Sequence, residues 1–282
     1  MEIINFTKRK IRQILEGLTR LLGKNKVGSI VYEQIVKQSM QQVHTIIYQG
    51  LEMQFSVPNQ LNYFRATTFA TKEPETLEWI DGLPEECVLW DIGANVGLYT
   101  VYAALQRRCR VVAIEPSIFN LELLARNLHL NTIHEKVILL PLALSDEMGS
   151  NLLRMTSTDW GGALSTFGKN IGWDGQNIQE VFSFPTYGLS MDQAVEILGL
   201  PAPDFIKMDV DGIEHFLLQG GTHVLKKIQG ILLEINDNFF EQAEISKELL
   251  ERAGLKFFDK RHSEMFEESK FKNLYNQIWV RK

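Results

Sequence analysis

The sequence has few of the residues that define several broad protein classes. Two of its 282 residues are cysteines, Cys87 and Cys109, too few for a disulfide framework and without metal-ligand spacing. With 20 glycines, 8 prolines and 45% hydrophobic residues, the chain is neither collagen-like nor of low complexity. No apolar run approaches the ~20 residues that cross a bilayer, and no secretion signal is evident. We therefore expect a soluble globular protein of the reducing cytoplasm.

The charge of the chain is net negative and unevenly distributed. There are 29 Lys and Arg against 35 Asp and Glu, a formal net charge of −6, so a nucleic-acid partner is not expected. Residues 1–26 hold seven Lys or Arg against two Glu, which places about +5 there. Apolar residues within 11–22 recur at three- and four-residue spacing, which predicts a basic amphipathic helix. Two alternatives are open: a contact with its own domain or a partner subunit, or attachment to the inner face of an anionic membrane.

Beyond this segment, predicted strands alternate with predicted helices. Residues 30–80 predict a helix, a strand pair at about 45–57 and a second helix. Core strands are expected at 88–92, 111–114, 137–144, 205–210 and 231–235, and a closing antiparallel pair at 255–258 and 277–280. Helices are expected between the core strands, which predicts an α/β fold with a mostly parallel central sheet. We divide the chain into a helical extension and lead-in (1–70) and a core domain (71–282), in which 145–190 form an insertion at the substrate side.

A glycine-containing turn joins the first core strand to the next helix. It reads Asp91-Ile-Gly93-Ala94-Asn95-Val-Gly97 and occupies the crevice position where open α/β sheets bind ligands. Gly93 allows a sharp turn, and Gly97 allows the helix and strand to pack closely. Asn95 replaces the second glycine of the dinucleotide fingerprint, which disfavours a pyrophosphate and hence a nicotinamide cofactor. Asp91 suits a ligand with a positive charge.

An acidic residue, Glu115, is expected at the end of the second core strand. At this position its carboxylate can accept both hydroxyls of a ribose. Pro116 is expected to begin the next helix. Together, the turn and the strand-end acid indicate a nucleoside ligand without a 2′-phosphate. At this point the sequence resembles the Rossmann-like S-adenosylmethionine-dependent methyltransferases.

Four further stretches make the sequence similar to the FkbM family of these enzymes. They are Lys72-Glu-Pro-Glu75, residues 88–97, the Gly-Gly-Ala-Leu-Ser-Thr run that ends at Thr166, and Phe205-Ile-Lys-Met-Asp-Val-Asp-Gly-Ile-Glu214. The family usually has Glu where this chain has Asp211. The resemblance implies a methyltransferase domain over about 75–282 that uses S-adenosyl-L-methionine. The expected cofactor-binding residues are Asp91, Gly93, Ala94, Asn95 and Gly97 of the turn, together with Glu73, Glu115, Pro116, Leu144, Ser145 and Asp209.

The run around Asp209 holds the candidate catalytic residues. A hydroxyl is a weak nucleophile at neutral pH and needs a positioned general base. Asp209 ends a predicted strand beside the glycine turn, and Glu214 and His215 follow within one helical turn. Asp211 and Glu214 could instead cap the following helix, and His215 could be structural. Because Asp-x-Asp-Gly fails the calcium-loop pattern, no metal is expected.

The insertion and a later strand provide candidate residues for the acceptor. Trp160, Ser165 and Thr166 combine an aromatic ring with hydroxyls, which suits a polyol, although a serine-rich turn without function has the same composition. Glu234 and Asn236 end a core strand at the same edge. The resemblance to the FkbM family implies an O-methyltransferase, which we expect to act on a hydroxyl of a saccharide or secondary metabolite. Two alternatives remain: a nicotinamide-dependent oxidoreductase, and a non-catalytic S-adenosylmethionine-binding module.

Overall fold

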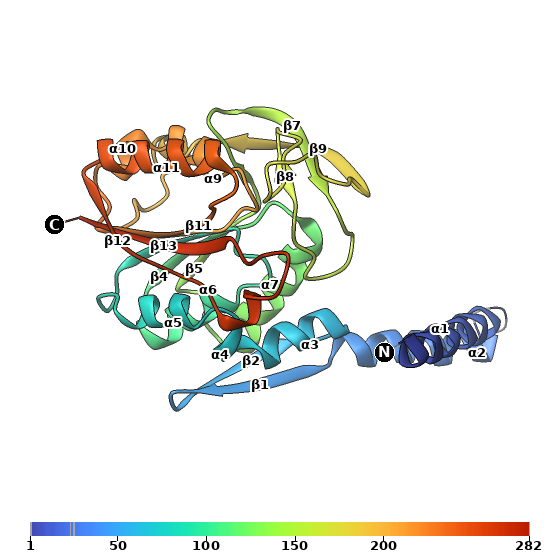
Figure 1. The fold of residues 1–282 in the computed structure, drawn as a ribbon. Coiled ribbons are helices and arrows are strands. Elements are labelled where there is room, and N and C mark those ends of the chain that lie inside the picture. The colour runs from blue at the N-terminus through green and yellow to red at the C-terminus, as the bar shows by residue number, and fades with distance from the viewer. Residues whose placement is uncertain (1, 23, 25, 282) are drawn as a thin grey trace.

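The computed structural model describes residues 2–22, 24 and 26–281, and its centre is a seven-stranded sheet with helices on both faces (Figure 1). The strand order is β12-β13-β11-β10-β3-β4-β5. The parallel strands are β3 (Val88–Ile92), β4 (Arg110–Ile114), β5 (Val137–Leu140), β10 (Phe205–Met208) and β11 (Gly230–Asn236). The antiparallel strands β12 (Leu255–Arg261) and β13 (Leu274–Arg281) close one edge. The expected mostly parallel sheet with a C-terminal antiparallel pair is confirmed.

Alternate side chains of the central strands serve two separate cores. Trp90 and Ile92 pack on the face covered by the later helices, whereas Leu89 packs on the opposite face, as the two-residue period of a strand requires. The first face carries α8 (Met191–Glu196), α9 (Glu214–Gln219), α10 (Thr222–Leu225) and α11 (Phe240–Arg252). The second carries α5 (Pro74–Asp81), α6 (Leu98–Gln106) and α7 (Ile118–Leu130). The sheet is therefore buried on both sides, which is typical of parallel sheets.

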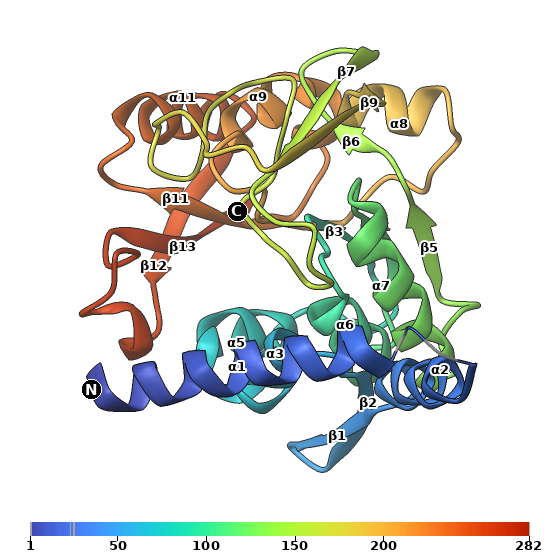
Figure 2. The same ribbon diagram turned by 90° about the vertical axis from the view of Figure 1, so that its right-hand side faces the viewer.

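The insertion, together with residues 143–144, forms a second sheet that the sequence did not predict. Its order is β6-β9-β7-β8, with β6 (Ala143–Leu144), β7 (Gly149–Met155), β8 (Thr166–Phe167) and β9 (Phe182–Leu189). The single strand expected at 137–144 is wrong, because β5 ends at Leu140 and β6 pairs with β9 instead. Pro141 follows Leu140 and has no N–H for a sheet ladder. Figure 2 shows this second sheet standing at one end of the central sheet.

The N-terminal part contains two helices, a hairpin and two further helices. Helices α1 (Glu2–Leu22) and α2 (Lys26–Met40) contact each other and project from the body (Figure 1). Strands β1 (Val43–Tyr48) and β2 (Leu51–Ser56) form the expected antiparallel hairpin. The sequence did not indicate α3 (Gln60–Thr67) or α4 (Phe69–Lys72). None of the helices in the described ranges is both long and apolar enough to cross a membrane.

Candidate active site

A cavity of about 330 Å³ lies at the carboxyl edge of the parallel strands. This volume is in the range of small-molecule binding sites. Its wall includes the glycine turn after β3, the residues that follow β4 and β10, the end of β11, the second sheet and α3. Ten residues named above as catalytic, cofactor-binding or acceptor candidates contribute to it: Glu73, Gly93, Ala94, Asn95, Glu115, Pro116, Leu144, Ser165, Asp209 and Glu234. Asp209 and Asp211 complete the wall where β10 ends.

The glycine turn has the conformation that its residues favour. Gly93 has φ +78°, and a Cβ there would stand 1.8 Å from the carbonyl oxygen of Asp209. Asn95 also lies in the left-handed region, with φ 51°, which asparagine tolerates better than most residues. At Gly97, with φ +81°, a Cβ would stand 2.2 Å from Leu124 Cδ1 of α7. Gly93 thus lets two strand ends approach closely, while Gly97 lets α6 and α7 pack.

Glu115 lies directly after β4 and is held by the backbone. Its Oε2 accepts a hydrogen bond from the N–H of Asn95 at 2.9 Å, and its Oε1 accepts one from the N–H of Ser117 at 2.8 Å. Burial raises the pKa of Glu115 to about 7, although both backbone donors act in the opposite direction. Each carboxylate oxygen can accept a second hydrogen bond, so Glu115 can bind ribose hydroxyls. Pro116 lines the cavity but precedes the helix, because Ser117 is the N-cap of α7.

A buried charge network lies next to the glycine turn. The Nζ of Lys207 on β10 is 3.2 Å from Asp209 Oδ2 and 3.8 Å from Asp91 Oδ1. Asp91 also accepts a 2.5 Å hydrogen bond from Thr100 Oγ1 and does not line the cavity. Burial lowers the pKa of Lys207, but the charges of Asp209, Asp91 and Glu73 outweigh it and raise the pKa above its usual value. Asp91 therefore acts through Lys207, which fixes one oxygen of Asp209.

Glu73 joins this network from the segment that precedes α5. Burial raises its pKa, but the nearby charges of Lys72 and Lys207 reverse the effect and bring the pKa down to about 2. The Nζ of Lys72 is 2.5 Å from Glu73 Oε1. Glu73 is thus a fixed negative charge in the cavity wall at all pH values where the protein is expected to work.

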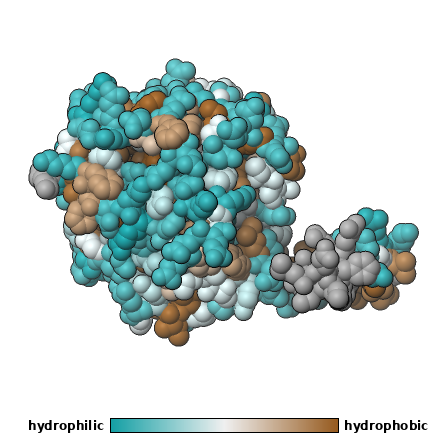
Figure 3. All heavy atoms as spheres, in the orientation of Figure 1, coloured by the Kyte–Doolittle hydropathy of each residue, from teal (hydrophilic) through white to brown (hydrophobic). Residues whose placement is uncertain are grey.

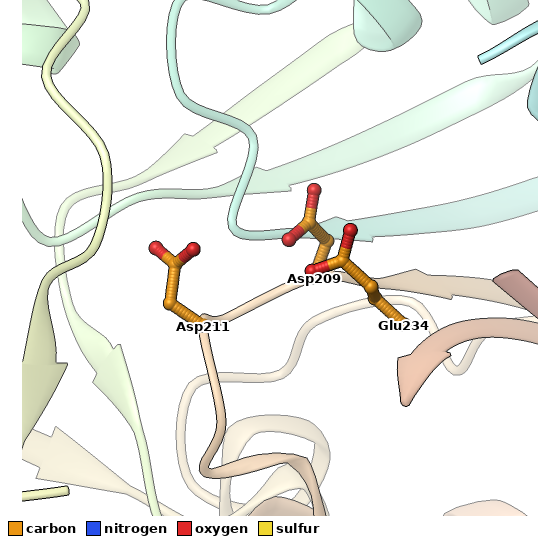
Figure 4. A group of neighbouring side chains, drawn as sticks. All are labelled: Asp209, Asp211 and Glu234. Atoms are coloured by element: carbon orange, nitrogen blue, oxygen red, sulfur yellow. The ribbon is translucent and has the colours of Figure 1, made fainter. Parts of the chain in front are cut away.

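Three carboxylates meet where β10 and β11 end. Asp209, Asp211 and Glu234 each offer an oxygen, and these oxygens all lie within 4.8 Å of one another (Figure 4). Burial, followed by the charge of Asp209, raises the pKa of Asp211 to about 7 and that of Glu234 well above its usual value. Closely spaced carboxylates resist simultaneous ionisation. The cluster can therefore accept a proton from an acceptor near neutral pH, and its geometry could also hold a divalent cation.

Asp211 connects this cluster to the loop that covers the cavity. Its Oδ2 accepts a hydrogen bond from the N–H of Leu164 at 2.7 Å. The carbonyl oxygens of the loop are held by side chains from other elements. Trp160 O accepts from Asn59 at 3.0 Å and Asn62 at 2.8 Å, Gly161 O from Arg65 Nη2 at 2.7 Å, and Gly162 O from Asn95 at 2.9 Å and Asn120 at 3.0 Å. The lead-in helix α3 and the glycine turn thus fix the position of this loop.

The structure places several predicted site residues away from the cavity wall. Glu214 is fully buried and accepts hydrogen bonds from the N–H groups of Val210 at 2.9 Å and Gly212 at 3.1 Å. His215 packs between Phe216 and Phe239, and burial lowers its pKa to about 4. Asn236 donates to the carbonyl oxygen of Trp173 at 3.0 Å. Gly97, Ser145, Trp160 and Thr166 also lie outside the lining. The geometry of Glu214 and Asn236 is that of residues that fix turns and loops.

The cavity also contains residues that the sequence did not indicate. They include Leu61, Phe64 and Arg65 of α3, Lys72 of α4, Lys207 of β10, Leu153 and Phe167 of the second sheet, Phe266 and Phe271 between β12 and β13, and Leu274 at the start of β13. Lys207 could have been predicted from the sequence, because a lysine inside an apolar strand needs an acidic partner. The sequence offers no such indication for the other residues. Their contact with the cavity depends on how the second sheet and the segment around the 3-10 helix η1 (Glu264–Phe266) fold over the carboxyl edge of the central sheet.

Residues 91–269, more than half of the chain, match the family described as the methyltransferase FkbM domain. The chain belongs to the FkbM methyltransferase family. The hexuronic acid methyltransferase AglP of Haloferax volcanii is 24% identical over 189 residues, which cover 66% of this chain and 72% of that protein. This FkbM protein is therefore an S-adenosylmethionine-dependent methyltransferase, and the nicotinamide-dependent alternative is set aside.

Solved structures of other methyltransferases are similar to this FkbM enzyme at low sequence identity. The precorrin-6y C5,15-methyltransferase of Geobacter metallireducens is 17% identical, with a TM-score of 0.42, over 74% of this chain and 86% of that one. TYW2 of M. jannaschii, in complex with AdoMet, is 14% identical, with a TM-score of 0.44, over 85% of this chain and 87% of that one. The order of strands in the central sheet agrees with the Rossmann-like methyltransferase fold expected from the sequence.

Proposed function

We propose that this enzyme transfers the methyl group of S-adenosyl-L-methionine to a hydroxyl oxygen of a saccharide or secondary metabolite. One observation carries the proposal. A single cavity joins the glycine turn and Glu115, which suit a nucleoside, to the carboxylates that follow β10 and end β11, which suit a proton acceptor. The name of the Haloferax relative, a hexuronic acid methyltransferase, supports a sugar acceptor.

The cavity wall fits the cofactor. Gly93 leaves the backbone accessible where the nucleoside would approach, and Glu115 offers oxygens to its ribose. Leu144, Leu153 and Phe167 provide an apolar surface for a purine ring. When bound, S-adenosyl-L-methionine supplies an electrophilic methyl group on a positively charged sulfonium. The wall holds five acidic and three basic side chains. The acidic members are Glu73, Glu115, Asp209, Asp211 and Glu234, and the basic ones are Arg65, Lys72 and Lys207.

Asp209 is the residue that we expect to act on the acceptor. Lys207 holds its Oδ2, so Oδ1 is the oxygen that we expect to face the acceptor hydroxyl. In the reaction, the hydroxyl oxygen forms a bond to the methyl carbon while the bond from that carbon to sulfur breaks. The hydroxyl proton passes to the Asp209 carboxylate. Alignment and deprotonation are the main contributions of the protein, because the sulfonium is already a good leaving group.

The chemical character of the acceptor is inferred from four other residues of the cavity wall. Arg65 and Lys72 contribute positive charge near the carboxylate cluster, and Phe266 and Phe271 contribute aromatic faces. Aromatic faces and polar side chains together suit a sugar ring, and the two basic residues can accommodate a sugar acid. We therefore expect a polyhydroxylated acceptor rather than an amine.

The test of this proposal is the substitution Asp209→Asn, which keeps the shape of the side chain but removes its basicity. We expect turnover to fall by ~10²-fold or more while the affinity for S-adenosylhomocysteine is nearly unchanged. Glu196→Gln, at an exposed position of α8, is the matched control and should leave both quantities unchanged. If affinity falls in proportion to turnover, Asp209 binds the cofactor instead. In that case Asp211→Asn and Glu234→Gln would locate the base.

A further inference from the structure

The α1–α2 hairpin exposes an unusual concentration of large apolar side chains. Ten of them, all within residues 14–36, are between 43% and 73% exposed. They are Ile14, Leu15, Leu18, Leu21, Val27, Ile30, Val31, Tyr32, Ile35 and Val36. Both hydrophobic and hydrophilic side chains reach the surface of this projection in Figure 3. Large contiguous apolar surfaces on folded proteins mark sites of interaction with a partner or a membrane.

The hairpin and the rest of the protein carry opposite net charges. Residues 1–40 hold eight Lys or Arg and three Glu, a net charge of about +5, whereas the remainder of the chain carries about −11. Arg20, Lys24, Lys26 and Lys37 are exposed on the described part of the hairpin. A surface that is both apolar and negatively charged would complement these residues, and an anionic lipid bilayer is such a surface.

Two more exposed apolar side chains lie on α3, at the cavity wall. Leu61 and Phe64 of α3 line the cavity, yet they are 36% and 44% exposed. In Figure 1 the hairpin projects from the body beyond α3. If the hairpin binds a membrane, these apolar residues of α3 therefore lie on the side of the body from which the hairpin extends.

We propose that the α1–α2 hairpin is a docking surface for an anionic lipid bilayer, in which its apolar side chains enter the interface while its basic side chains contact lipid headgroups. A second copy of the chain fits the hairpin less well. In a symmetric contact that pairs the two hairpins with each other, each hairpin would carry about +5 and the two would repel.

Co-sedimentation of the full chain with lipid vesicles tests this proposal. We expect binding to vesicles of phosphatidylcholine that contain phosphatidylglycerol, weak binding to pure phosphatidylcholine, and loss of binding as salt is raised. Removing two charges with Arg20→Gln and Lys24→Gln should weaken partitioning by about 30-fold, at about fivefold for each basic residue. Leu15→Ser with Leu18→Ser should abolish binding, because it removes apolar side chains from the interface.

Matched controls lie on β12, an edge strand of the central sheet. Lys256→Gln and Phe258→Ser alter an exposed charge and an exposed aromatic side chain of β12, and both should leave vesicle binding unchanged. Binding of S-adenosylhomocysteine verifies that each variant is folded. Equal binding to neutral and anionic vesicles would overturn the proposal. A second pair of results would also overturn it: the protein fails to bind vesicles, and analytical ultracentrifugation shows a dimer that the two leucine substitutions dissociate. These results would assign the hairpin to a contact with a second copy of the chain.

Discussion

The binding of cofactor should depend on pH through Glu115. This carboxyl is 6% exposed, and its pKa is raised to about 7 by burial. Ribose hydroxyls donate to the ionised carboxylate, so bound cofactor lowers the pKa of Glu115. Because the free protein has the higher pKa, binding must release a proton below about pH 7. Affinity therefore rises with pH across neutrality and falls toward acid.

The size of this effect follows from the fraction of ionised Glu115. With a pKa of about 7, roughly nine-tenths of the carboxyls are ionised at pH 8 and roughly one-tenth at pH 6. The apparent dissociation constant varies inversely with the fraction of protein in which Glu115 is ionised, so it should be about tenfold higher at pH 6 than at pH 8. S-adenosylhomocysteine is a suitable probe, and isothermal titration calorimetry in buffers of different ionisation enthalpy would also count the released proton.

The substitution Glu115→Gln separates this group from the other carboxyls of the cavity. It should weaken binding at pH 8 by ~1 to 3 kcal/mol, the loss expected for charge-assisted hydrogen bonds, and should remove most of the tenfold pH effect. Glu196→Gln should retain both the affinity and the pH effect of the unaltered protein. The reasoning would be refuted if Glu115→Gln bound normally, or if it bound weakly but kept the full pH dependence.

Three further outcomes follow from the structure. Gly93→Ala should abolish binding of S-adenosylhomocysteine in calorimetry, because a Cβ 1.8 Å from the carbonyl oxygen of Asp209 forces the turn apart; normal binding would show that the turn is not at the site. Glu214→Ala should lower the free energy of unfolding in urea by ~2 to 4 kcal/mol, since it leaves buried N–H donors unpaired, while binding per folded molecule is unchanged; a loss of turnover without a loss of stability would make Glu214 catalytic. A chain that begins at Ile30 should bind S-adenosylhomocysteine with unchanged affinity, because the cavity wall begins at Leu61; a folded truncation that cannot bind would place the first helix at the site.

The sequence predicted the parts of the site that depend on local order along the chain. Gly93 and Glu115 lie where a parallel sheet delivers the ends of neighbouring strands, so a strand followed by a turn is enough to place them. Asp209 follows for the same reason, because β10 pairs with β3. Such positions are fixed by the order of strands and helices alone.

The sequence did not predict the parts of the site that distant segments contribute by folding onto this edge of the sheet. Nothing local in Arg65 or Phe271 indicates that α3 and the β12–β13 segment border the same cavity. His215 shows the converse error in reasoning. Its closeness to Asp209 in the chain suggested a shared site, but the first turn of α9 directs it toward Phe216 and Phe239. Two residues that are close in the chain at the start of a helix need not face the same side of the sheet.

The most direct test of the proposed reaction is to identify the atom that receives the methyl group. The protein would be incubated with S-adenosyl-L-methionine that carries a carbon-13 methyl group, and with neutral sugars, sugar acids and amino sugars in parallel. The chemical shift of the transferred carbon distinguishes a methyl ether from a methyl ester and from an N-methyl group. We predict a methyl ether on a sugar hydroxyl, formed by the unaltered protein and at least ~10²-fold more slowly by Asp209→Asn. A methyl ester or an N-methyl product would contradict transfer to a hydroxyl.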